Sequence, residues 1–141
     1  MKMNWTDTYH AWREAVDSRE LQEAHQILTD ARKRISQQEK EDRWSWFIDA
    51  LDKEDNISGF AVNVIHKHSI PKTLLSPILE AAMKFGNPTS IKFYVLPCVE
   101  TYGKQIVEEY LEKLAREYPD GDEKLSFARY WLHRTNSTRT K

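Results

Sequence analysis

Residues 106–118, IVEEYLEKLAREY, carry the clearest periodicity in the chain. Their apolar side chains recur at steps of one, three or four residues, which places them along one face of an α-helix. The side chains on this face are Ile106, Val107, Tyr110, Leu111, Leu114, Ala115 and Tyr118. The Pro-Asp-Gly-Asp sequence at 119–122 predicts a turn, and a further apolar stripe after it predicts another helix. That second stripe consists of Leu125, Ala128, Trp131 and Leu132. The two stripes predict a helical hairpin.

The same spacing continues toward the N-terminus and predicts six further helices. Their apolar stripes begin at Trp5, Leu21, Trp44, Ile57, Leu75 and Ile91. Two features oppose this interpretation. Pro77 and Pro97 fall inside helical stripes, where a proline costs about 3 kcal/mol, and residues 91–95, IKFYV, have the composition of a strand. We expect helix throughout, because no second strand is predicted to pair with 91–95.

Length and composition are typical of one packed domain. The chain has 141 residues, of which five are Trp, six Tyr and five Phe, and a disordered chain rarely carries so many large apolar side chains. Its formal net charge is -1, which argues against a surface built entirely for nucleic acid or anionic membrane. Cys98 is the one cysteine, so no intrachain disulfide can form. With no apolar leader and no run of about 18 apolar residues, we expect a cytoplasmic protein without a membrane partner.

A weak repeat runs through the second part of the chain. Three segments, which open at Phe47, Ile78 and Leu111, each consist of an apolar helix, a short polar turn and a second apolar helix. Their starting positions are 31 and 33 residues apart. A single hairpin of this kind cannot bury both of its apolar faces, whereas stacked hairpins can.

The middle unit resembles a HEAT-type (armadillo-type) helical repeat. Its first helix, Leu75–Ala82, contains a proline, its turn is Gly86-Asn87-Pro88, and a second apolar helix follows. The resemblance implies antiparallel hairpins stacked as a short α-solenoid; a plain helical bundle is the alternative. The expected organisation is one all-α domain over 1–141, made of an N-terminal hairpin as a cap at 1–36, three HEAT-like hairpins at 43–134 and a flexible basic tail at 135–141.

The sequence offers little that suggests catalysis. His66 and His68 are two residues apart, about 200° around a helix, so they cannot bind one metal ion from one face. Cys98 lies within an apolar stripe, where core packing is the expected role. Neither a Gly-rich phosphate loop nor a Ser-His-Asp signature occurs in the sequence. We therefore predict no catalytic, cofactor-binding or metal-binding residues and a non-enzymatic protein.

A second apolar set suggests a binding surface. Val62, Phe93 and Phe127 lie off the main stripes of the three second helices, with Leu96 and Tyr130 nearby. The HEAT resemblance implies that second helices line a concave face. If exposed, these side chains would form a ridge for another protein. The alternative is that they pack between neighbouring repeats.

The HEAT resemblance also allows nucleic-acid binding in a basic groove. It would make Lys67, Lys92 and Arg129 phosphate contacts. Residues 37–55 contain seven acids and three bases, and residues 104–124 seven acids and four bases, which argues against that function. We predict an adaptor that binds a partner protein, with nucleic-acid binding as the alternative. The predicted partner-binding residues are Val62, Lys67, Lys92, Phe93, Leu96, Phe127, Arg129 and Tyr130.

Overall fold

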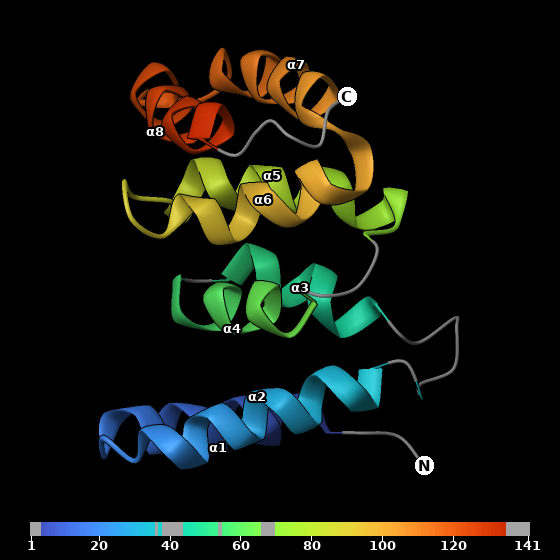
Figure 1. Ribbon diagram of the computed structural model, residues 1–141, viewed down its shortest axis with the longest axis vertical. Helices are drawn as coiled ribbons and strands as arrows, with labels where there is room; N and C mark the ends of the chain where they lie inside the picture. The colour runs from blue at the N-terminus through green and yellow to red at the C-terminus, as the bar shows by residue number, and fades with distance from the viewer. Residues whose placement is uncertain (1–3, 36, 38–43, 54, 66–69, 135–141) are drawn as a thin grey trace. The chain divides into compact units, whose positions relative to one another are not determined.

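The computed structural model describes residues 4–35, 37, 44–53, 55–65 and 70–134, and the regular secondary structure in these residues is entirely α-helical (Figure 1). The eight helices in them are α1 (Trp5–Asp17), α2 (Leu21–Ile35), α3 (Ser45–Lys53), α4 (Asp55–Ile65), α5 (Lys72–Phe85), α6 (Ile91–Tyr102), α7 (Lys104–Ala115) and α8 (Gly121–Arg134). The predicted all-α class is confirmed, and residues 91–95 are helical. The predicted tail at 135–141 lies outside the described residues.

The chain divides into two compact units, residues 1–67 and 68–141. In the first unit α1 packs on α2, α3 packs on α4, and α2 also contacts α4. In the second unit α5 packs on α6, α7 packs on α8, and α6 also contacts α8. Each unit thus consists of two hairpins whose second helices touch. The division follows residue 67, whereas the sequence predicted one domain whose repeats begin at residue 43.

Aromatic side chains hold the first unit together. The rings of Trp5 and Phe47 meet edge to face with centroids 5.0 Å apart, and those of Tyr9 and Phe60 lie 5.6 Å apart. All four side chains are buried. Ring pairs of this geometry add about 0.5–1.5 kcal/mol to the stabilisation from burial. The stripe that begins at Trp5 is therefore the face by which α1 packs on α3 and α4.

Both interior prolines of the second unit lie within helices, Pro77 in α5 and Pro97 in α6. A proline removes the hydrogen bond to the carbonyl four residues earlier, here those of Thr73 and Phe93. Both of these residues are exposed, so water can replace the missing donor. Pro97 itself is buried beside the apolar stripe of α6, and this packing offsets part of its cost.

Polar contacts at both ends of α6 fix its position. At its start, the Asn87 Oδ1 atom accepts hydrogen bonds from the backbone N–H groups of Thr89 and Ser90, at 2.9 and 2.7 Å. The Ser90 Oγ atom accepts one in return from the Asn87 N–H at 3.2 Å. At its end, the Tyr102 hydroxyl donates to the Ile70 carbonyl at 2.6 Å. Gly103, with φ of +93°, then turns the chain directly into α7.

Candidate functional site

Lys92 is at the centre of a cluster of rings and cations at the start of α6. Its Nζ atom lies 4.6 Å from the centroid of the Trp131 ring and 5.3 Å from that of Phe93. Both distances are within the range in which an ammonium group is attracted to the face of an aromatic ring. Phe93 keeps 39% of its surface exposed. The Lys92 side chain therefore lies against apolar surface, while the neighbouring ring remains accessible.

Trp131 links the start of α6 to the last turns of α8. Its indole Nε1–H donates a hydrogen bond to the Pro88 carbonyl at 2.9 Å. The Tyr130 ring meets the Trp131 ring edge to face at 5.1 Å, and the Arg134 guanidinium lies 5.3 Å from the Tyr130 centroid. Tyr130 is 55% exposed. Contacts thus run without interruption from Phe93 through Lys92, Trp131 and Tyr130 to Arg134, and we call these five residues the ring–cation surface.

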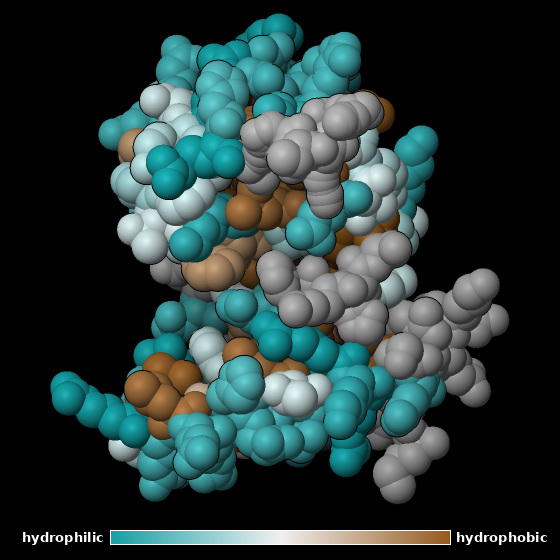
Figure 2. Space-filling model, viewed as in Figure 1, coloured by the Kyte–Doolittle hydropathy of each residue, from teal (hydrophilic) through white to brown (hydrophobic). Residues whose placement is uncertain are grey.

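Five of the eight predicted partner-binding residues lie on α6 and α8 at or near this surface. Lys92, Phe93 and Tyr130 belong to it, and Leu96 and Phe127 are half-buried one helical turn away. Apolar side chains reach the surface of each unit between hydrophilic ones (Figure 2).

Of the remaining predicted residues, Val62 is buried and Lys67 is not among the described residues. Val62 in α4 is only 2% exposed, so its side chain is part of the core of the first unit and not of an accessible ridge. A position off the main stripe of α4 is still covered, because that helix is contacted by both α3 and α2. Lys67 lies outside the described residues.

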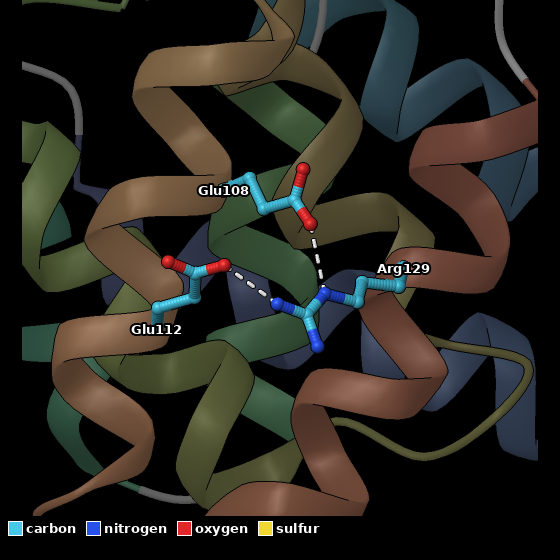
Figure 3. Close-up of polar contacts among 3 residues, drawn as sticks. All are labelled: Glu108, Glu112 and Arg129. Carbon is cyan, nitrogen blue, oxygen red and sulfur yellow. Dashed lines mark hydrogen bonds and ion pairs between the residues drawn. The ribbon is translucent and has the colours of Figure 1, made fainter.

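Arg129 is held by two carboxylates of α7. Its Nε atom donates to Glu108 at 2.8 Å and an Nη atom donates to Glu112 at 2.6 Å (Figure 3). The hydrogen bond to Glu108 is the main cause that raises the pKa of Arg129. The carboxylates lie one turn apart on α7, so the guanidinium fork spans both. Arg129 thus joins α8 to α7, and a phosphate could take it only by displacing carboxylates.

Sequence reasoning missed Trp131 and Arg134 as members of the surface. Trp131 was assigned to the core stripe of α8, although it is only half-buried and hydrogen-bonded to the start of α6. The sequence does contain a signal for these two residues, a second helical stripe on α8. This stripe consists of Phe127, Tyr130, Trp131 and Arg134, and it faces away from the one formed by Leu125, Ala128 and Leu132.

Cys98 is fully buried in α6, and burial raises the pKa of its thiol to about 12. A thiol in this state is a poor nucleophile, because only the thiolate attacks. Within the part of the chain that the structure describes, no three His, Cys, Asp or Glu side chains converge as metal ligands. No helix in that part is long and apolar enough to cross a bilayer.

Known proteins give no indication of what this chain does, so a functional proposal rests on the geometry of the site. No protein-family model, no curated protein and no solved structure matches the chain.

Proposed function

We propose that this chain is a non-enzymatic adaptor that binds another protein through the ring–cation surface. One observation carries the proposal: Phe93 and Tyr130 stay substantially exposed although Lys92, Trp131 and Arg134 hold them in a continuous cluster. Aromatic side chains and arginine are enriched at the energetic centres of protein interfaces.

The organisation of the helices supports a role in binding. In both units the second helix of one hairpin contacts the second helix of the next. This arrangement is the one expected of stacked HEAT-like hairpins, and we propose that the three hairpins α3–α4, α5–α6 and α7–α8 are divergent repeats of that type. In a repeat protein the second helices share one side, so α6 and α8 present their outward side chains together.

Nucleic-acid binding is the second candidate, and the charges favour it less. Of the cations that the sequence assigned to phosphate contacts, Arg129 is paired with Glu108 and Glu112. A phosphate backbone needs several unpaired cations along its path. The acidic side chains of α7 next to Arg129 would repel it.

A capture experiment tests the adaptor function. The tagged full chain is incubated with a lysate of its native host, beside a Phe93→Ser/Tyr130→Ser variant and an Ile106→Ser control, and the bound proteins are identified by mass spectrometry. Ile106 is a suitable control because it is an exposed apolar residue on α7, outside the surface. We expect proteins that the wild type and the control retain and the double variant loses. If all three baits retain the same proteins, binding through the ring–cation surface is refuted.

A further inference from the structure

Helix α8 carries apolar side chains on two sides. Leu125, Ala128 and Leu132 are buried and form its core face. Phe127, Tyr130, Trp131 and Arg134 are spaced by three, one and three residues, which places them on a second face about 140° away from the first. Every member of the second face is half-buried or exposed. The second face is only partly used within the second unit, where Trp131 packs on Lys92 and donates a hydrogen bond to Pro88 while Tyr130 and Arg134 remain exposed.

The two cations of the ring–cation surface have no carboxylate partner among the described residues. In the part of the chain that the structure describes, neither Lys92 nor Arg134 forms an ion pair, whereas Arg129 and Lys124 do. Neighbouring sequence offers no acid either, because neither residues 81–99 nor residues 124–134 contain an Asp or Glu. The surface thus combines two accessible rings with two positive charges that no acid of the described residues neutralises.

We infer that the partner docks on this surface through an acidic segment that carries an aromatic or aliphatic side chain. Its carboxylates would pair with the Lys92 ammonium and the Arg134 guanidinium, and its apolar side chain would pack on Phe93 and Tyr130. This inference rests on the proposed adaptor function and specifies the chemistry of its partner. Charge complementarity of this kind sets association rate and specificity.

An acidic peptide fits this surface better than a nucleic acid. Among the described residues, the unpaired cations of the surface are Lys92 at the start of α6 and Arg134 at the end of α8. A short peptide can place two carboxylates against them. A phosphate backbone carries a charge at every nucleotide and needs more unpaired cations along its path, whereas residues 104–124 have seven acids against four bases.

Selection from a random 12-residue peptide library, displayed on phage, tests the inference with the full chain as bait. The enriched peptides are expected to be rich in Asp and Glu and to contain Phe, Trp, Tyr or Leu. Isothermal titration then gives the affinity of the best peptide. A 15-nucleotide oligo-dT is titrated alongside as a probe of the nucleic-acid alternative.

Two matched variants locate the binding. Lys92→Gln/Arg134→Gln removes both charges of the surface, and Lys113→Gln/Arg116→Gln removes two exposed charges on and just after α7. We expect the first to weaken peptide binding roughly fivefold to thirtyfold, the sum of two partly exposed ion pairs, and the second to leave it unchanged. Raising the salt from about 0.1 to about 1 M should also weaken binding, because the screening length falls from about 10 to about 3 Å. Circular dichroism confirms that each variant is folded.

The outcomes separate the two proposals. Enrichment of basic or uncharged peptides that lose binding in the Phe93→Ser/Tyr130→Ser variant would overturn the acidic partner and leave the adaptor function standing. Equal weakening by both charge variants would overturn the location of the site. Binding of oligo-dT without any enriched peptide would overturn both proposals in favour of nucleic-acid binding. If neither a peptide nor oligo-dT binds, the acidic-segment inference is wrong.

Discussion

The same substitution, Gly→Ala, should have opposite effects at two positions of this chain. A Cβ atom added to Gly121 at the start of α8 would lie 2.6 Å from the carbonyl carbon of Ala115 and closer still to its oxygen. Among the described residues, no heavy atom outside the local helix lies within 4 Å of a Cβ added to Gly59 in α4. The close approach at Gly121 involves backbone atoms, which cannot rotate away as a side chain can.

The expected magnitudes follow from these distances. Alanine has a higher helix propensity than glycine, and space for its methyl group exists at Gly59. Gly59→Ala should therefore stabilise the first unit by about 0.5–1 kcal/mol. At Gly121 the end of α7 and the start of α8 must separate, and overpacking of this kind costs about 1–3 kcal/mol. For units of this size, each kcal/mol corresponds to a shift of about 4–8 °C in Tm.

Hydrogen–deuterium exchange resolved by peptide is the appropriate assay, because the two substitutions lie in different units that need not unfold together. Gly121→Ala should speed exchange in α7 and α8, and Gly59→Ala should slow it in α3 and α4. Urea denaturation followed by circular dichroism supplies the free energies. Unchanged or slower exchange in α7 and α8 of Gly121→Ala would show that the helices do not approach as closely as described.

Three further predictions follow from single contacts. Asn87→Ala removes the side-chain oxygen that caps the start of α6, and it should destabilise the second unit by about 1 kcal/mol in urea denaturation. Asn87→Asp keeps an oxygen at this position and should cost much less. Equal losses of stability in the two variants would contradict the capping role. Arg129→Gln should cost at most about 1 kcal/mol, because its side chain is 40% exposed, and a double-mutant cycle with Glu112→Gln measures the coupling. The same variant should keep its affinity for acidic peptides, since Arg129 is already paired; a large loss would place Arg129 in the binding site. Burial raises the pKa of Cys98 to about 12 from an ordinary value of 9.0, so the thiol ionises first in the unfolded state. The stabilisation is complete below pH 9 and declines as the pH rises toward 12, by up to about 1.4 kcal/mol per pH unit. The urea midpoint should therefore fall more steeply between pH 8 and 10.5 for the wild type than for Cys98→Ala. Equal pH dependence of the two midpoints would contradict the effect of Cys98 burial.

The ring–cation surface shows how much of a surface the helical period can predict. The period placed Phe93 off the main stripe of its helix with Tyr130 nearby on α8, and both side chains are exposed. The same reasoning placed Val62 on the ridge, although its side chain is buried. Periodicity gives the angle of a side chain around its own helix, but the number of neighbours that cover this angle depends on packing. Helix α4 is contacted by α2 and α3, and the covered angle there includes Val62.

The positions of the helices follow from local sequence, because the apolar spacing and the turn signals that produce them involve neighbouring residues. Even Pro77 and Pro97 did not prevent helix formation, since the surrounding stripes favoured burial of the helix on both sides of each proline. The contact between the end of α8 and the start of α6 depends instead on how the helices pack in three dimensions. The hydrogen bond from Trp131 to Pro88 and the pairing of Arg129 with α7 join positions 43 and 17–21 residues apart. The local spacing of apolar residues does not encode such contacts, because they depend on how whole helices pack.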